Sequence, residues 1–174
     1  MKLPVIERED GAGGRPWFAD GLNFTCTGCG DCCTGGPGYV WISEEEVARL
    51  AEFLKLTVDE TMAQHCRRVG DRISVREHRN SSGLYDCNFL KEIEATRVVE
   101  GQPVRYTKRI CEIYPVRPLQ CRTWPFWPEN LTSEKAWQIA GKKCPGMNDA
   151  EGKRYPLRQI EDIRDAKDWP GKRD

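Results

Sequence analysis

The stretch FTCTGCGDCC, residues 24–33, holds four cysteines, and the last two of them are adjacent. The whole chain of 174 residues has nine cysteines. In a reducing compartment, repeated cysteine spacings indicate metal ligands more often than disulfides. A disulfide between Cys32 and Cys33 would also be strained, because adjacent side chains point apart. We therefore expect a metal-binding role, with a disulfide framework as the alternative.

The chain shows no pattern typical of an exported or membrane protein. Its start, MKLPVIEREDGAGG, lacks an apolar core of about seven residues, and no later stretch approaches the roughly 20 apolar residues that span a bilayer. Lys and Arg total 27, as do Asp and Glu, so the formal net charge is +0. This balance creates no overall field that attracts nucleic acid or an anionic membrane. We expect a cytoplasmic protein whose partners are metal ions, with no nucleic acid and no membrane.

Length and pattern together predict a small α+β fold. A chain of this size suits one domain, so we expect residues 1–174 to form a single, loop-rich domain with a cysteine-lined metal-binding region at 21–148. Residues 1–20 mix charges, glycines and a proline, and we expect a flexible lead-in whose end is held by Trp17 and Phe18.

Two capping boxes predict the N-terminal helices. Ser43 with Glu46, and Thr57 with Glu60, have the spacing in which a hydroxyl and a carboxylate cap one helix start reciprocally. The apolar periodicity that follows predicts helices at 44–55 and 58–69.

Other elements follow from alternation, turns and prolines. Four prolines exclude a long helix between Cys111 and Pro128. The remaining predictions are strands at 38–42, 72–78 and 136–140, a β-hairpin at 95–109 that turns at 100–103, and a C-terminal helix within 155–169.

One of the nine cysteines has surroundings unlike those of the other eight. Cys66 lies on the apolar face of the second predicted helix, with Val58, Met62 and Val69, and we expect it in the core. The others flank turn-forming residues, where loops can direct sulfur inward. These eight candidate metal ligands are Cys26, Cys29, Cys32, Cys33, Cys87, Cys111, Cys121 and Cys144.

The spacing of the first cysteines suits either zinc or an iron–sulfur cluster. In C-x2-C the chain curls so that both sulfurs face one point, and Gly28 and Gly30 permit that curl. C-x2-C-x2-C matches the start of the bacterial ferredoxin pattern, but Cys33 comes too early to be its fourth ligand. Because adjacent side chains are expected to diverge, we predict that Cys32 and Cys33 serve different metal centres, with different metals of one cluster as the alternative.

Eight thiolates need nearby positive charge. Candidate cations beside the proposed ligands are Arg109, Arg117, Arg122, Lys142 and Lys143, which would lower thiol pKa values; a solvated surface role is the alternative. His65 and His78 lack ligand spacing and are expected to be structural. We find neither a Ser-His-Asp pattern nor a phosphate-binding glycine loop.

Four cysteine-containing segments follow one another along the chain: CTGCGDCC, CNFL, CEIYPVRPLQCRTWP and CPG. In this order they resemble the CxxCxxCC cysteine-cluster family, described as zinc- or iron-chelating domains and often called YkgJ-like. The resemblance runs from Cys26 to about Gly146. It implies that the eight cysteines above are the family's cysteines and that Arg117 and Arg122 are cofactor-binding positions. Cys66 matches nothing in the pattern, and the segment between Cys87 and Cys111 looks longer than the family's minimal spacing.

The resemblance implies metal binding without an agreed reaction. Some members are labelled iron–sulfur oxidoreductases, and a similar cluster is found in flagellin lysine methylases. We expect an iron–sulfur cluster or zinc, with iron–sulfur slightly preferred, held by up to eight thiolates. The alternatives are an iron–sulfur oxidoreductase or accessory of a protein-modifying enzyme, and a structural zinc module that binds a partner.

Overall fold

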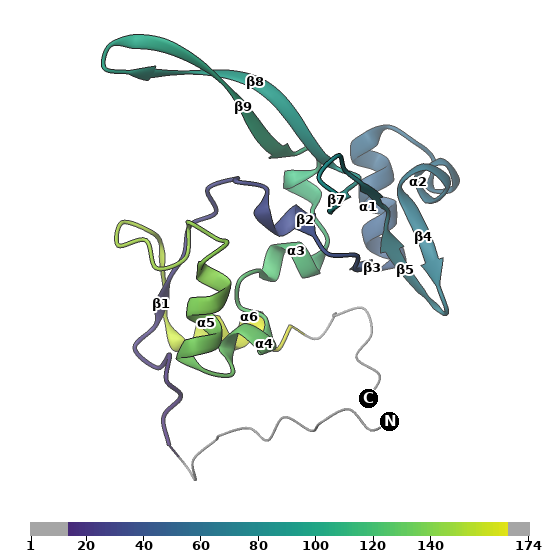
Figure 1. The fold of residues 1–174 in the computed structure, drawn as a ribbon. Helices are drawn as coiled ribbons and strands as arrows, with labels where there is room; N and C mark the ends of the chain where they lie inside the picture. Colours follow the sequence, from purple (N-terminus) through teal and green to yellow (C-terminus); the bar gives the residue numbers. More distant parts are fainter. Residues whose placement is uncertain (1–13, 167–174) are drawn as a thin grey trace. The chain divides into compact units, whose positions relative to one another are not determined.

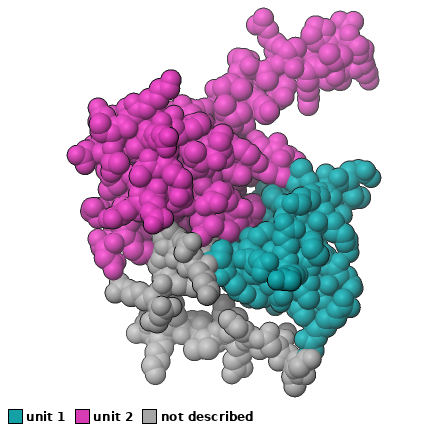
Figure 2. Space-filling view, turned by 180° about the vertical axis from the view of Figure 1, so that it is seen from behind, with its two compact units in different colours: residues 1–25, 125–166 teal, residues 26–124, 167–174 magenta. Residues whose placement is uncertain are grey.

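The computed structural model describes residues 14–166, which form two compact units (Figure 2). Unit 1 contains residues 14–25 and 125–166, and unit 2 contains residues 26–124. Helices and several small sheets are mixed along the chain, as the α+β prediction requires (Figure 1). The predicted lead-in lies mostly outside the described residues. The single-domain prediction for residues 1–174 remains a prediction.

A three-stranded sheet with two helices carries the core of unit 2. The strands β3 (Val40–Ile42), β5 (Arg72–Val75) and β4 (Cys66–Val69) pair antiparallel in that order. Helices α1 (Glu44–Leu54) and α2 (Val58–His65) both begin with the predicted capping boxes. Ile42, Val47 and Leu50 belong to the buried cluster that joins helix and sheet.

The prediction that α2 continues to residue 69 is wrong. The helix ends at His65, and Cys66 begins strand β4 opposite Val75 of β5. The sheet gains a third strand in this way, and that pairing outweighs a local helical pattern. Cys66 is nevertheless buried, with 1% of its surface exposed.

Unit 2 contains a second small sheet. Its strands are β2 (Thr34–Gly35), β7 (Tyr85–Cys87) and β6 (Glu77–Arg79). The single strand predicted at 72–78 is therefore two strands, β5 and β6, in different sheets. They separate at Arg76, whose N–H donates to the His65 carbonyl next to β4 and whose carbonyl accepts from the Asn88 N–H next to β7.

The predicted hairpin is present and longer than expected. Strands β8 (Leu90–Val99) and β9 (Gln102–Cys111) pair over ten residues each. Glu100 and Gly101 form the turn with φ values of 50° and 79°, the left-handed conformation that two-residue hairpin turns require. The hairpin ends at Cys111 and so connects directly to a proposed ligand.

The proline-rich segment contains only short turns, as predicted. After β9 come a 3₁₀ turn, η2 (Tyr114–Val116), and the five-residue helix α3 (Leu119–Thr123). Another 3₁₀ turn, η1 (Asp31–Cys33), precedes β2. Three of the candidate cysteines, Cys32, Cys33 and Cys121, lie in these short turns.

Unit 1 is built on an aromatic core. Strand β1 (Leu22–Asn23) pairs with β10 (Arg154–Tyr155), and the helices are α4 (Pro128–Leu131), α5 (Glu134–Gly141) and α6 (Leu157–Arg164). Phe126 stacks on Trp137 with 5.7 Å between ring centroids and meets Phe24 edge-on at 6.1 Å. These contacts give unit 1 its own core.

Two predictions for unit 1 need correction and one is confirmed. Residues 136–140 are not a strand, because Ser133 caps α5 and helical spacing buries Trp137. The C-terminal helix is shorter than 155–169: residue 155 lies in β10, α6 ends at Arg164, and residues 167–169 lie outside the described residues. Phe18 is buried and the Trp17 indole donates to the Leu131 carbonyl at 2.9 Å, so both hold the start of the unit as expected.

Within residues 14–166, no helix has the length and apolar character needed to cross a membrane.

Candidate metal centre

Glycine conformation sets the loop that carries Cys32 and Cys33. Gly30 has φ 78° and precedes η1, whose Cys33 N–H donates to the Gly30 carbonyl at 2.9 Å. A Cβ on Gly30 would lie 3.0 Å from both Leu90 Cδ1 and Arg109 Cβ, so the loop packs tightly against the base of the hairpin. Arg109 also pairs with Asp31 at this place. The turn is thereby fixed beside Cys111, the last residue of β9.

Five thiols interact with one another in unit 2, and we call them the thiol cluster. The sulfurs of Cys32 and Cys33 are 3.8 Å apart, and the Cys33 thiol also hydrogen-bonds with Cys111. Cys87 and Cys121 lie close enough to interact electrostatically with Cys32 and Cys111. The cluster consists of Cys32, Cys33, Cys87, Cys111 and Cys121.

The adjacent pair does not point apart as the sequence suggested. With Sγ atoms 3.8 Å apart, Cys32 and Cys33 contribute to the same cluster. The 3₁₀ turn explains this, because its backbone places successive side chains about 120° apart, whereas a strand would direct them to opposite faces. The expectation of divergence assumed an extended backbone.

Hydrogen bonding gives the thiols of the cluster different pKa values. Hydrogen bonds with Cys33 lower the pKa of Cys32 and the pKa of Cys111 to about 7, and they raise the pKa of Cys33. Burial raises the pKa of Cys87 to about 11 and also raises the pKa of Cys121. Within the cluster, Cys32 and Cys111 are therefore the first to become thiolates.

Arg117 supplies positive potential to the thiol cluster. Its charge lowers the pKa values of Cys32, Cys111 and Cys121. The guanidinium lies 3.7 Å from the Tyr114 ring centroid, and Nε donates to the Tyr114 carbonyl at 3.2 Å. Arg117 is thus held in place by an aromatic ring and a backbone acceptor.

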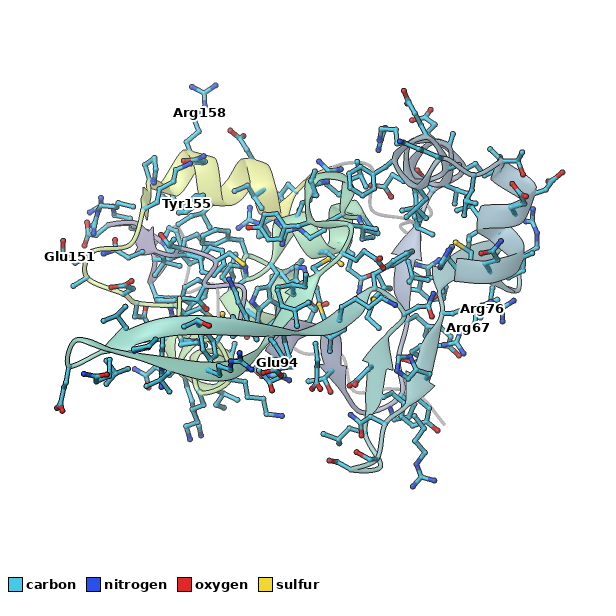
Figure 3. The ribbon with its side chains drawn as sticks, turned by 90° about the horizontal axis from the view of Figure 1, so that it is seen from above. Arg67, Arg76, Glu94, Glu151, Tyr155 and Arg158 are labelled. Carbon is cyan, nitrogen blue, oxygen red and sulfur yellow. The ribbon has the colours of Figure 1, made fainter. Side chains whose placement is uncertain are left out.

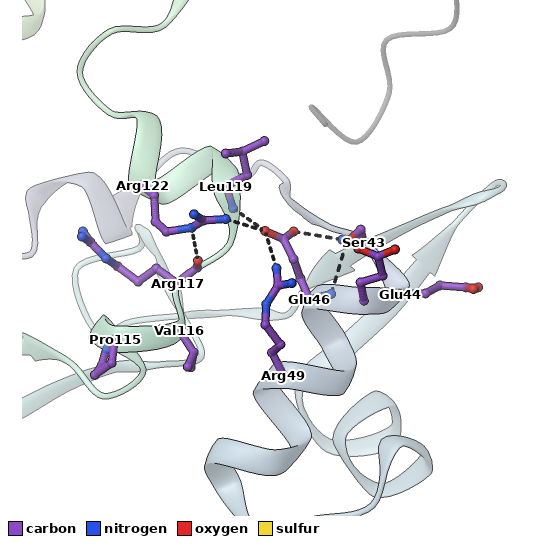
Figure 4. Close-up of a pocket in the computed structure, with 10 residues that line it drawn as sticks. Ser43, Glu44, Glu46, Arg49, Pro115, Val116, Arg117, Leu119 and Arg122 are labelled. Carbon is purple, nitrogen blue, oxygen red and sulfur yellow. Dashed lines mark hydrogen bonds and ion pairs between the residues drawn. The ribbon is translucent and has the colours of Figure 1, made fainter. Parts of the chain in front are cut away.

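Arg122 contacts a buried carboxylate of α1. Its Nη2 lies 3.3 Å from Glu46 Oε1, and its Nε donates to the Arg117 carbonyl at 2.9 Å (Figure 4). Glu46, 5% exposed, also accepts from the Leu119 N–H at 2.7 Å and from the Ser43 N–H at 3.1 Å. These bonds tie α3, which carries Cys121, to the start of α1.

The Glu46 network borders a pocket of about 800 Å³. Three arginines and three glutamates line it, so their formal charges cancel. On its other side, α3 is fixed to β3, because Gln120 accepts from the Trp41 N–H at 2.7 Å and donates to the Tyr39 carbonyl at 3.1 Å. Glu46 and Gln120 together determine where Cys121 lies.

The remaining candidate cysteines have other neighbours. Cys26 is exposed and hydrogen-bonds with the Tyr114 side chain, which raises the pKa of that phenol. Burial raises the pKa of Cys29, which also lies near Asp31 and Thr27. Cys144 is buried in unit 1 after α5, where its N–H donates to the Gly141 carbonyl at 3.2 Å. Its role as a ligand remains a prediction.

Metal-ligand geometry is not preformed in the described part of the chain. Among residues 14–166, no three or more Cys, His, Asp or Glu side chains converge as they would around a metal ion. The interacting thiols therefore do not by themselves confirm the expected cysteine-lined centre. Its donor set of five neighbouring sulfurs is nonetheless the kind that zinc, Cu(I) and iron–sulfur clusters prefer.

Sequence reasoning missed the part that two residues play in the site. Glu46 was recognised as a helix cap, but its bond to Leu119 joins residues 73 positions apart. Asp31 carries no motif of its own. Asp31, which lies between Cys29 and Cys32, could have been matched with a cation such as Arg109 on the hairpin.

The fold and the thiol cluster define a small, cysteine-rich α+β protein with soft sulfur donors gathered on loops. The chain belongs to the CxxCxxCC family, described as "Putative zinc- or iron-chelating domain", whose sequence profile matches residues 25–145. An uncharacterised protein of Methanocaldococcus jannaschii is 28% identical over 109 residues, which cover 63% of this chain and 48% of the relative. The match thus spans about half the length of that relative. No solved structure matches the chain.

Proposed function

We propose that the thiol cluster of unit 2 binds a metal centre through thiolates. The observation that carries this proposal is the grouping of five interacting thiols from one turn, two strands and a helix: Cys32, Cys33, Cys87, Cys111 and Cys121. Thiols brought together from separate elements without disulfides are typical of a metal site in a reducing compartment. Cys26 and Cys29 precede the cluster in one C-x2-C unit, and we propose them as further ligands.

The chain itself prepares the thiols for binding. Metals take thiolates, so each ligand must lose its proton. Cys32 and Cys111 ionise first, and Arg117 favours their negative charge. Cys33 ionises after them, because its hydrogen bonds with Cys32 and Cys111 raise its pKa. Binding therefore releases protons and strengthens as the pH rises.

The identity of the metal centre rests on two opposing arguments. The C-x2-C-x2-C spacing is typical of iron–sulfur ligation and supports our slight preference for iron–sulfur. The 3.8 Å between the Cys32 and Cys33 sulfurs is also the edge of a sulfur tetrahedron with zinc–sulfur bonds of about 2.3 Å. An iron–sulfur cluster would supply one-electron transfer, whereas zinc in a filled site would supply structure alone.

The experiment is metal and acid-labile sulfide analysis of protein purified without oxygen, together with its visible spectrum. Iron with sulfide and a brown colour would identify an iron–sulfur protein, and reversible reduction would favour the oxidoreductase role. Stoichiometric zinc in a colourless protein would favour the structural module. Protein that binds neither after reconstitution would contradict the proposal.

Two cysteine-to-serine variants make a matched pair. Cys33→Ser removes the central thiol of the cluster and is expected to lower metal content at least severalfold. Cys66→Ser changes the same atom in the β-sheet core and should leave metal content unchanged. Equal metal content in both variants would exclude the thiol cluster as the binding site.

Cys32→Ser tests the prediction of separate centres for the adjacent cysteines. Since both sulfurs lie in one cluster, we now expect Cys32→Ser and Cys33→Ser to give the same spectrum and the same residual metal. Different spectra would favour two centres, as the sequence suggested.

A further inference from the structure

The hairpin of β8 and β9 extends away from the rest of unit 2 (Figures 1 and 2). Within the described residues, each strand pairs only with the other. Ten residues at about 3.3 Å each make an arm of roughly 30 Å. Its base is anchored by the buried Leu90, whereas most residues beyond are exposed. A two-stranded ribbon without a third strand is only marginally stable in water, so the presence of this long arm requires an explanation.

The register assigns every hairpin residue to one of two faces. Directly paired residues share a face, and successive residues alternate between faces. One face holds the pairs Lys91↔Ile110, Ile93↔Lys108, Ala95↔Tyr106, Arg97↔Val104 and Val99↔Gln102. We call it the cationic face. Arg97 lies 5.2 Å from the Tyr106 ring centroid, as expected for diagonal neighbours on one face.

The cationic face combines an apolar row with unbalanced positive charge. Ile93, Val99 and Val104 are 40%, 42% and 39% exposed. Lys91, Arg97 and Lys108 stand among them, and none of the ten residues carries a carboxylate. Of the three cations, Lys91 lies 3.8 Å from Glu112, just beyond the strand. Arg97 and Lys108 are the charges that flank the apolar row further along the arm.

The opposite face is electrically balanced. Glu92 and Glu94 stand there with Arg105 and Arg109. The Thr107 hydroxyl donates to Glu94 at 3.1 Å, and Arg109 pairs with Asp31 at the base. In the view from above, Glu94 lies along the ribbon (Figure 3). This face satisfies its own charges, whereas the cationic face leaves both its charge and its apolar row uncovered.

We propose that the cationic face docks onto a partner protein whose surface presents carboxylates around an apolar centre. Such a surface would neutralise Arg97 and Lys108 while it covers Ile93, Val99 and Val104, which is charge complementarity around a hydrophobic contact. The inference does not depend on the metal.

Two other classes of partner fit less well. Glu100 occupies the turn, so an anionic membrane or nucleic acid that reached the end of the arm would meet a negative charge there. The apolar row runs along the arm from Ile93 to Val99 beside the turn, so a flat protein surface can cover it. Insertion into a membrane would instead need an apolar turn, and this turn is Glu100 and Gly101.

The test uses the full chain and a defined probe. The probe is a fluorescent amphipathic helical peptide with a leucine stripe bordered by glutamates, and its control has lysines in place of the glutamates. Fluorescence anisotropy should show at least tenfold tighter binding of the glutamate peptide. Equal binding of both peptides, or no binding of either, would overturn the proposal.

Matched variants on the two faces locate the binding. Lys108→Glu should weaken binding of the glutamate peptide at least tenfold, whereas Arg105→Glu makes the same charge change on the opposite face of β9 and should have little effect. Val104→Thr should weaken it severalfold, with Val98→Thr as the opposite-face control. Circular dichroism and metal content should stay unchanged in all four. Equal losses on both faces would show nonspecific attraction and contradict the proposal.

Two further measurements test the other possible partners of the cationic face, which are a membrane and a second copy of the chain. Wild-type chain should not sediment with vesicles of mixed phosphatidylcholine and phosphatidylserine, and it should elute at the mass of a monomer in size-exclusion chromatography. Vesicle binding lost in Lys108→Glu would replace the protein partner by a membrane. A dimer broken by Lys108→Glu would replace it by a second copy.

Discussion

At the scale of single residues, Cys66 is the thiol that belongs to the hydrophobic core. It is 1% exposed, packs with residues of the α1 and β-sheet cluster, and burial raises its pKa to about 11. Cys66→Ala removes one heavy atom from this cluster and should cost about 1 kcal/mol of unfolding free energy. Urea denaturation and metal analysis check this. A loss of metal would make Cys66 a ligand.

His65 makes the unfolding free energy of the protein depend on pH, and a single substitution can isolate this contribution. Burial lowers the pKa of His65 below its usual value, its Nδ1 lies 2.7 Å from Asn88 Nδ2, and its ring stacks on Phe89. The unfolded chain then binds the proton more readily, so the stability from neutral His65 is present above about pH 6.5 and is lost as the pH falls below it.

The measurement is the unfolding free energy at several values between about pH 5 and pH 7, where His65 titrates. The wild type should lose more stability on acidification than His65→Gln, which cannot be protonated in this range. A His78→Gln control should behave like the wild type. Parallel curves for wild type and His65→Gln would contradict the prediction.

Predictions for single residues were correct where the chemistry of the side chain decides its burial. They were wrong where the local direction of the backbone decides which way a side chain points. Burial of Cys66 could be predicted because an apolar environment was evident in either a helix or a strand. The convergence of Cys32 and Cys33 could not, since it depends on a 3₁₀ turn whose formation requires Gly30 to pack against the hairpin.

At the scale of elements, Glu46 connects α1 to α3. Glu46→Gln keeps the size of the side chain but loses its charge, so the bonds to Arg122 and Leu119 weaken together. We expect a loss of about 1–3 kcal/mol in unfolding free energy. Glu45→Gln, on the exposed side of the same helix turn, should change stability little. Chemical denaturation of both variants provides the comparison.

Elements with a strong local signal were predictable, and elements completed by distant partners were not. Capping boxes at Ser43 and Thr57 located both helix starts. The end of α2 was wrong because β4 needs β5, and residues 136–140 were mistaken for a strand because the cap at Ser133 was overlooked. The short strands β2 and β7 lack any alternating pattern long enough to detect.

At the scale of the whole molecule, metal removal should affect the two units differently. The proposed ligands of unit 2 lie on the three-residue strand β7, the five-residue helix α3, the end of the hairpin, and the turn η1 with the segment before it, so a bound metal would supply much of their order. Unit 1 has an aromatic core of its own.

Hydrogen exchange followed by mass spectrometry can compare metal-loaded and chelated protein. We expect residues 26–39 and 85–124 to lose protection, whereas the segments of unit 1 retain theirs. Unchanged exchange throughout unit 2 after complete metal loss would show that the metal does not stabilise the fold.

The pairing of β1 with β10 has a consequence for synthesis on the ribosome. Leu22 pairs with Tyr155, so the first strand of unit 1 has no partner until more than a hundred further residues have been translated. The described part of unit 2 ends at Trp124, and we expect it to fold while the chain is still growing. Unit 1 closes only afterwards, and until then Phe18, Leu22 and Phe24 remain apolar side chains that a nascent-chain chaperone can bind.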